Sequence, residues 1–209
     1  MNNIKGFIFD LDGTLVTSSL DFLAIKAEIG CPADVDALMY IAQLPTEKER
    51  QETMDIIHFH EMRDAQSCDW IPGARAFVTE CEARALPMAI VTRNSQRSSK
   101  VKLEKNNVPI QWLLTREDSI PKPDPTALLD IARGFELPVD QIMMVGDYRY
   151  DLEAGRNAGM PSCLVNFSVE PVYVSLADYS FKDFNQFHPH MFFQFLIHTY
   201  LHVAPPLSI

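Results

Sequence analysis

Hydrophobic residues of this chain gather in five short runs, most of which stop at a polar or turn-forming residue. Short, nearly continuous apolar runs are typical of parallel strands that are covered on both faces. Segments with apolar residues at helical spacing alternate with these runs from residue 71 onwards, at 73–85, 95–105, 126–135 and 151–158. The alternation predicts an α/β fold, a parallel sheet with helices on both faces. The predicted strands are Ile4–Phe9, Met88–Val91, Trp112–Thr115, Gln141–Val145 and Ser162–Phe167.

The segment between the first and second predicted strands has a different pattern. It holds three helical stretches with no strand between them: Leu20–Ile29, Ala33–Gln43 and Glu47–Cys68. Thr46 and Glu49 have the spacing of a capping box at the start of the third stretch. We therefore expect residues 17–69 to form a small inserted α-helical domain on a body made of residues 1–16 and 70–185.

An aromatic tail, residues 186–209, ends the chain. Its segment Met191–Leu201 is apolar on nearly every side, so as a helix it would need cover. Packing of this segment onto the body is the first interpretation, and a contact between two copies of the chain is the second. A monomer and a dimer therefore both stay open.

Composition narrows the possible classes of protein. The 209 residues are 47% hydrophobic and 22% charged, which is ordinary for a soluble globular protein, and no apolar run is long enough for a membrane span. The formal net charge of −10 argues against non-specific nucleic-acid binding, although it permits a phosphorylated substrate. Four scattered cysteines and the absence of room for a signal peptide before the first strand indicate reduced thiols and a cytoplasmic location.

Polar residues that could do chemistry follow several predicted strands. Asp10 and Asp12 come directly after the first strand, and two carboxylates at i and i+2 can point into one crevice at the sheet edge. Thr92 follows the second strand, Lys122 lies between two prolines, and Asp147 follows Gly146. Taken singly, these residues fit a helix cap, an exposed turn and a turn acid. Only their combination indicates a site.

That combination resembles the haloacid dehalogenase-like (HAD) hydrolase superfamily. The segment Asp10–Leu15, Asp-Leu-Asp-Gly-Thr-Leu, is similar to the first motif of the superfamily, and Thr92, Lys122 and the segment 146–151 match later motifs in the same order. The resemblance covers Ile4 to about Phe167 and is strongest to phosphoglycolate phosphatase-like members with a small helical cap. It implies a Rossmann-like body, a cap inserted after the first motif, and an edge strand near Asp178–Phe181.

The resemblance also implies a role for each motif residue. Asp10 would be the nucleophile that forms an aspartyl phosphate, and Asp12 the general acid and base. Asp10, Asp147 and the backbone carbonyl of Asp12 would bind Mg²⁺, with Asp151 supporting the metal from behind. The residues expected to bind the substrate phosphate are Gly13, Thr92, Arg93, Asn94 and Lys122. For Arg93, a salt bridge is an equally good interpretation.

The expected function is a Mg²⁺-dependent phosphatase that acts on a small phosphorylated metabolite, similar to phosphoglycolate phosphatase. Asp12 favours a phosphatase because the dehalogenases of the superfamily lack this second acid. Two alternatives stay open: a phosphomutase similar to β-phosphoglucomutase, and a catalytically silent binding protein on the same fold. The identity of the substrate depends on cap residues that carry no readable motif.

Overall fold

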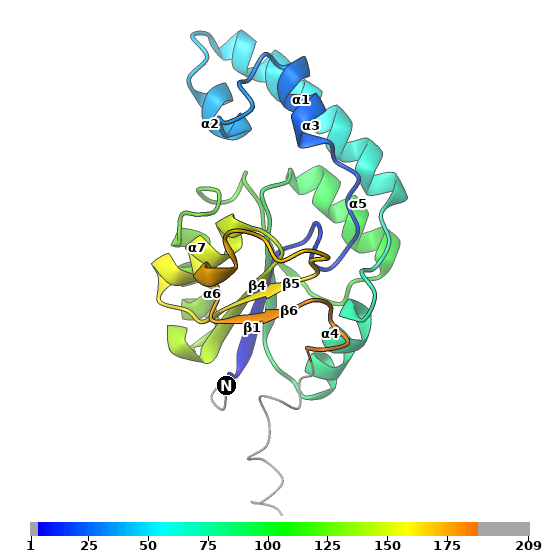
Figure 1. Cartoon of the computed structure of the whole chain (residues 1–209), viewed down its shortest axis with the longest axis vertical. Helices are drawn as coiled ribbons and strands as arrows, with labels where there is room; N and C mark the ends of the chain where they lie inside the picture. The colour runs from blue at the N-terminus through cyan, green and yellow to red at the C-terminus, as the bar shows by residue number, and fades with distance from the viewer. Residues whose placement is uncertain (1–3, 188–209) are drawn as a thin grey trace, which may run out of the picture.

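The computed structural model describes residues 4–187 of the chain. Its centre is a six-stranded sheet in which every pairing between neighbouring strands is parallel, with the order β3-β2-β1-β4-β5-β6 (Figure 1). The strands are β1 (Gly6–Phe9), β2 (Met88–Val91), β3 (Trp112–Leu114), β4 (Ile142–Gly146), β5 (Ser162–Val165) and β6 (Tyr179–Phe181). The strand order reverses between β1 and β4, and open α/β sheets bind ligands beyond the carboxyl ends of the strands at such a point.

Helices cover both faces of this sheet, as the sequence predicted. Phe7 and Phe9 of β1 face one cluster of buried side chains, which includes residues of α4 (Ala74–Ala83). Ile8 faces a second cluster with α6 (Thr126–Phe135) and α7 (Arg149–Ala158). Helix α5 (Gln96–Asn106) lies on the α4 side through Leu103. Alternate residues of a strand point to opposite faces, so an uninterrupted apolar run supplies both layers.

Three further helices lie between β1 and α4 in the sequence: α1 (Phe22–Glu28), α2 (Ala37–Ala42) and α3 (Glu47–Ser67). They form a group beyond the end of the sheet and have a small hydrophobic cluster of their own, while α3 also packs along α5 (Figure 1). The two chain segments that connect this group to the body pair antiparallel at Val16 and Trp70. The chain therefore leaves the body and returns to it at one place.

Most predicted elements are found close to their expected bounds. The capping box is present, since the Thr46 hydroxyl accepts from the Glu49 backbone N–H and the Glu49 carboxylate accepts from Thr46. Helix α2 is shorter than predicted because the Asp36 side chain accepts from the backbone N–H groups of Leu38 and Met39 and starts the helix at Ala37. The edge strand is present as β6. The aromatic tail lies outside the described residues. Two short 3₁₀ helices, Val139–Gln141 and Val174–Leu176, complete the described elements.

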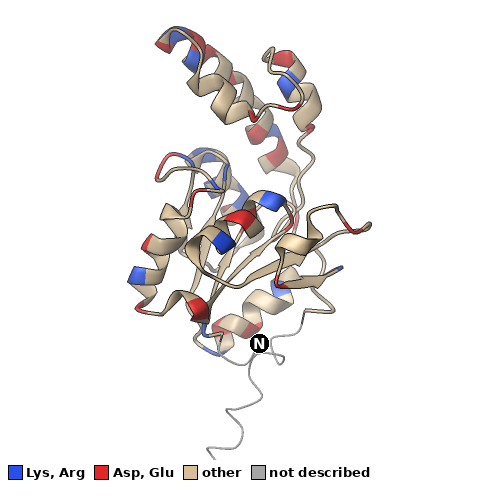
Figure 2. Cartoon of the chain, turned by 60° about the vertical axis from the view of Figure 1, so that its left-hand side comes forward, with Lys and Arg blue, Asp and Glu red and all other residues tan. Residues whose placement is uncertain are grey.

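Charged residues of both signs are interspersed over the body and the three inserted helices in the view of Figure 2. None of the helices within residues 4–187 combines the length and the apolar character that crossing a membrane requires.

Candidate active site

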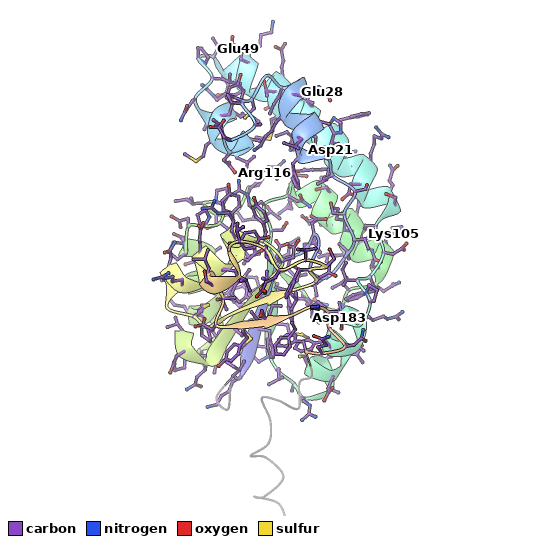
Figure 3. All side chains as sticks on the ribbon, viewed as in Figure 1. Asp21, Glu28, Glu49, Lys105, Arg116 and Asp183 are labelled. Carbon is purple, nitrogen blue, oxygen red and sulfur yellow. The ribbon has the colours of Figure 1, made fainter. Side chains whose placement is uncertain are left out.

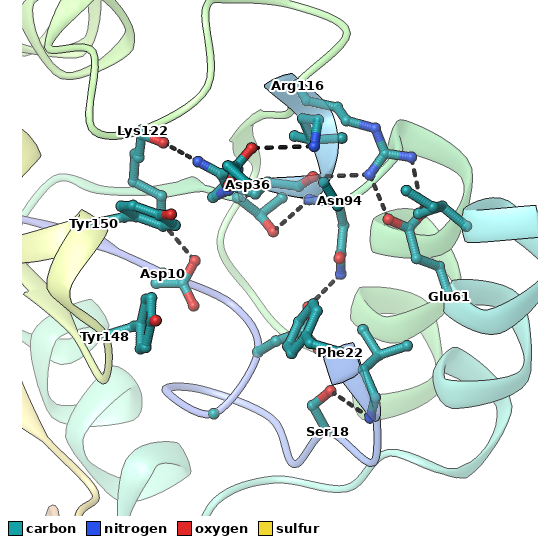
Figure 4. A pocket seen from close by; sticks show the side chains of 18 of the residues that line it. Asp10, Ser18, Phe22, Asp36, Glu61, Asn94, Arg116, Lys122, Tyr148 and Tyr150 are labelled. Atoms are coloured by element: carbon teal, nitrogen blue, oxygen red, sulfur yellow. Dashed lines mark hydrogen bonds and ion pairs between the residues drawn. The ribbon is translucent and has the colours of Figure 1, made fainter. Parts of the chain in front are cut away.

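The site lies where three neighbouring strands end. Asp10 follows β1, Thr92 follows β2 and Asp147 follows β4, so their side chains meet at one edge of the sheet. A cavity of about 440 Å³ opens there, between the body and helices α1–α3 (Figure 4). Of the residues predicted from the sequence, all of the acids, Gly13, Thr92, Arg93, Asn94 and Lys122 line this cavity. The structure therefore brings the whole predicted set together.

Three carboxylates form a tight cluster in this cavity. One oxygen from each of Asp10, Asp147 and Asp151 lies within 4.8 Å of the other two. Burial and the neighbouring charges of Asp10 and Asp151 raise the pKa of Asp147 to about 8, and burial raises the pKa of Asp151 to about 6 against the opposing charge of Lys122. A bound cation would offset both the burial of these carboxylates and their mutual repulsion. Oxygen-only donors suit a hard metal ion, so the residues fit a metal site.

Gly13 sits against this cluster with a backbone φ of +75°, in the left-handed region that favours glycine. A Cβ atom at this position would lie 2.2 Å from Oδ2 of Asp147. The neighbouring Thr14 hydroxyl donates to Oδ1 of Asp147 at 3.3 Å. Because Gly13 has no side chain, the Asp147 carboxylate can occupy the space beside it.

Lys122 is fully buried, so the interpretation of an exposed turn residue does not hold. Its ammonium donates to Oδ1 of Asp10, to Oδ1 of Asp151 and to the Val91 carbonyl oxygen, each at 2.6 Å. Burial opposes the charge, but the two carboxylates outweigh it and raise the pKa of Lys122 above its usual range. A permanent positive charge is therefore fixed beside Asp10.

Asp12 is held from the other side of the cavity. Its carboxylate accepts from the Asn94 amide and from the ammonium of Lys102, a residue of α5 whose side chain has no exposed surface. Burial raises the pKa of Asp12 to about 6 even though Lys102 opposes this shift. Lys102 was not predicted from the sequence. The signal for it was weak: Lys102 shares one face of α5 with Ser98 and Asn106, at a spacing of four residues, and all three are buried.

The residues after β2 are engaged with protein partners. The backbone N–H of Asn94 donates to the Thr92 hydroxyl at 3.2 Å. Arg93 donates to the Lys122 carbonyl oxygen and, at 2.5 Å, to the carboxylate of Asp36, and its guanidinium lies 4.4 Å from the centre of the Tyr150 ring. Of the two interpretations of Arg93, the structure thus shows the salt bridge, with a partner from the inserted helices.

Two further ion pairs join the inserted helices to the body, and the sequence did not indicate either. Glu61 of α3 accepts from both terminal nitrogens of the Arg116 guanidinium. The distance from Nη2 of Arg116 to Oε2 of Glu61 is 3.1 Å. Asp64 of α3 accepts from Lys102 at 2.6 Å. Figure 3 shows Arg116 between the body and the inserted helices. All these side chains are nearly or fully buried, so the contact between the two parts is charged as well as apolar.

Comparisons with known proteins identify the family of this chain. The family model for haloacid dehalogenase-like hydrolases matches residues 7–165. An uncharacterized hydrolase of Saccharomyces cerevisiae is 30% identical over 197 residues, which cover 89% of this chain and 90% of that protein. A phosphoglycolate phosphatase of Vibrio cholerae is 27% identical, with 76% and 83% covered.

A solved structure of a hydrolase from Pseudomonas syringae has the same fold. Its TM-score is 0.71 at 20% identity, and the match covers 86% of this chain and 94% of that one. The family model spans most of the chain and includes the segments that carry Asp10, Thr92, Lys122 and Asp147. The chain is therefore a member of the haloacid dehalogenase-like hydrolase family.

Proposed function

We propose that this hydrolase is a Mg²⁺-dependent phosphatase that cleaves a small phosphorylated metabolite through an aspartyl phosphate on Asp10. The observation that carries the proposal is the contact between Lys122 and Asp10 beside the acidic cluster. A carboxylate attacks a phosphate dianion only where positive charge offsets the repulsion between them. Relatives named as phosphatases support the same reaction class.

In the first half of the reaction, an Asp10 oxygen forms a bond to phosphorus and the bond from phosphorus to the leaving oxygen breaks. Asp12 gives its proton to that oxygen as general acid. In the second half, Asp12 takes a proton from water, and the water oxygen displaces the Asp10 carboxylate from phosphorus. The raised pKa of Asp12 suits a group that must hold a proton in one step and release it in the next.

Asp10, Asp147 and the backbone carbonyl of Asp12 would hold the Mg²⁺ ion, and Asp151 would support the set through its contacts with Lys122 and the Tyr148 backbone N–H. A bound Mg²⁺ ion supplies positive charge that offsets the negative charge of the phosphoryl oxygens. Lys122 supplies the permanent cation of the chain itself beside the nucleophile.

The phosphoryl group would be bound by Lys122, by the Thr92 hydroxyl and by backbone groups near Gly13. Asn94 and Arg93 were expected to bind it too, but their side chains already donate to Asp12 and Asp36. We propose that Asn94 orients Asp12, and that Arg93 fixes the inserted helices above the phosphate site. Residues 17–69 would then act as a cap that closes the cavity and excludes water.

Replacing the nucleophile tests this function. Asp10→Asn keeps the size of the side chain and removes the charge that attacks phosphorus, so phosphate release in the presence of Mg²⁺ should fall by more than about a hundredfold. Asp140→Asn, at an exposed site outside the cavity, should leave the rate unchanged.

The same assay separates the alternatives. A phosphomutase would give an isomerised sugar phosphate with little free phosphate, and a silent binding protein would bind phosphate esters without turnover. If Asp10→Asn kept more than about a hundredth of the wild-type rate, Asp10 would not be the nucleophile.

A further inference from the structure

The cavity that holds the acidic cluster is also lined by aromatic and aliphatic side chains. Phe22 and Tyr148 leave 62% and 47% of their surfaces exposed, and both line the cavity that holds Asp10 (Figure 4). Tyr150 adds a second aromatic ring on the body side. The apolar residues that the inserted helices and their leading segment contribute are Leu20, Phe22, Ile25, Ala37, Leu38 and Ile57. A cavity of this size and lining suits a ligand with an apolar portion.

The cations of the cavity are already engaged. Arg93 pairs with Asp36, and Arg116 pairs with Glu61, so neither guanidinium can bind a substrate carboxylate unless a cap acid loses its partner. Separating the nearly buried pair of Arg116 and Glu61 is costly, and separating the part-buried pair of Arg93 and Asp36 costs less. Lys122 contacts Asp10 and Asp151, and under the proposed function it serves the phosphoryl group and not a second anionic group.

The remaining cation, among the described residues that line the cavity, is Lys26. It is half-buried and donates to the Ala33 carbonyl at 2.9 Å.

The net charge of the cavity lining also disfavours a second anionic group on the substrate. Six acidic and four basic residues of the described chain line the cavity, so its protein wall is net acidic. A bound divalent cation would offset this excess. Its positive charge would then interact with the phosphate dianion of the substrate, so none would remain for a second anion. A second anionic group on the same substrate would find both guanidiniums paired with acids and only the Lys26 ammonium, already bound to a backbone carbonyl, and it would add repulsion.

We propose that the substrate is a phosphate monoester of an uncharged, largely apolar or aromatic alcohol, and that esters carrying a carboxylate are poor substrates. This inference rests on the proposed phosphatase activity and adds the class of leaving group. The leaving group lies against Phe22, Leu38 and Tyr148 while the phosphoryl group faces Asp10. The ion pair between Arg93 and Asp36 disfavours a substrate carboxylate, because it occupies the guanidinium that would otherwise bind that group.

Phosphate release by the purified full chain with Mg²⁺ tests the proposal on two matched pairs of esters. Phenyl phosphate against ethyl phosphate measures the apolar contact, and kcat/KM should be at least about tenfold higher for the phenyl ester. Phosphoglycolamide against 2-phosphoglycolate differs mainly in charge, and the amide should be preferred by about tenfold or more.

A substitution at Asp36 tests the reason for the charge preference. Asp36→Asn keeps an oxygen that can start α2 but removes the charge that holds Arg93. The ratio of kcat/KM for 2-phosphoglycolate to that for phosphoglycolamide should then rise about tenfold, because Arg93 becomes free for the carboxylate. Asp21→Asn is the matched control: Asp21 starts α1 in the same way but pairs with no arginine within the described residues (Figure 3). Its ratio should equal that of the wild type.

The outcomes separate the two levels of the proposal. Release of phosphate from none of the four esters by the folded protein would overturn the phosphatase activity and this inference with it. Phosphate release with equal kcat/KM values for 2-phosphoglycolate and its amide, or for the phenyl and ethyl esters, would overturn the inference alone.

Discussion

Replacing Lys102 by methionine is the sharpest test of how the inserted helices are fixed to the body. Lys102 has no exposed surface, and its ammonium lies between Asp12 after β1 and Asp64 of α3. Methionine keeps the unbranched chain and a similar helix propensity but removes the charge. Asp64 would then stay buried without a cation, and Asp12, whose side chain is part-exposed at the cavity wall, would lose its only cation partner among the described residues.

The loss of stability can be worked from these contacts. Removing one partner of a buried ion pair costs about 3–5 kcal/mol. Asp64 keeps the backbone N–H of Ser19 at 2.6 Å and two serine hydroxyls as donors, and Asp12 keeps the Asn94 amide. We therefore expect the lower end of the range, about 3 kcal/mol, which corresponds to a fall in Tm of about 6–12 °C for a domain of this size.

Urea and thermal unfolding followed by circular dichroism measure this loss. Lys100→Met is the control, because Lys100 lies on the same helix with an exposed side chain, and its free energy of unfolding should change by no more than about 0.5 kcal/mol. A loss below about 1 kcal/mol for Lys102→Met would refute the view that this lysine joins two buried acids.

Acidification should reduce the difference in the free energy of unfolding between Lys102→Met and the wild type. Burial acts to raise the pKa of Asp64, but Lys102 and Ser19 outweigh it and hold the pKa below its ordinary value of 3.8. A carboxyl with a depressed pKa stabilises the fold above its unfolded pKa, and this stabilisation is lost as the pH falls through the folded pKa. Without Lys102 the buried carboxyl takes up its proton at a higher pH. The stability gap should therefore shrink from about pH 7 to about pH 3, and a constant gap would indicate that Lys102 acts by packing alone.

Two further predictions concern the acidic cluster. Treatment with a chelator should abolish phosphate release, and added Mg²⁺ should restore it. An activity assay in metal-depleted buffer measures both effects. Full activity with the chelator present would contradict a metal at Asp10 and Asp147. Gly13→Ala should raise the Mg²⁺ concentration for half-maximal activity by about tenfold or more, because the new Cβ would lie 2.2 Å from the Asp147 carboxylate; an unchanged Mg²⁺ titration would show that the loop adjusts freely.

The fold and the grouping of the motif residues could be predicted because local signals determine them. An apolar run followed by a polar residue marks the carboxyl end of a parallel strand, and such ends meet at one edge of the sheet. The ends of β1, β2 and β4 therefore carry Asp10, Thr92 and Asp147 into one cavity. Lys122 needed the resemblance, because a lysine between two prolines has no local signal for burial.

The contacts between the inserted helices and the body could not be predicted in this way. Asp36 and Arg93 are 57 positions apart in the sequence, and Glu61 and Arg116 are 55 apart. A charged residue on a helix normally faces solvent, so nothing in the sequence distinguishes Glu61 from its exposed neighbours on α3. Such pairs depend on how two separately formed groups of helices and strands dock, which no local pattern encodes.

The net charge of the chain likewise does not reveal which charged residues face one another. A chain with a formal charge of −10 has, within its described part, a cavity whose cations are few and each engaged. The acids that give the chain its charge are used there in two ways: Asp10, Asp147 and Asp151 repel one another and so favour a bound cation, whereas Asp36 and Glu61 neutralise arginines. Composition counts all five alike. Their opposite effects on an anionic substrate follow only from which partner each carboxylate faces.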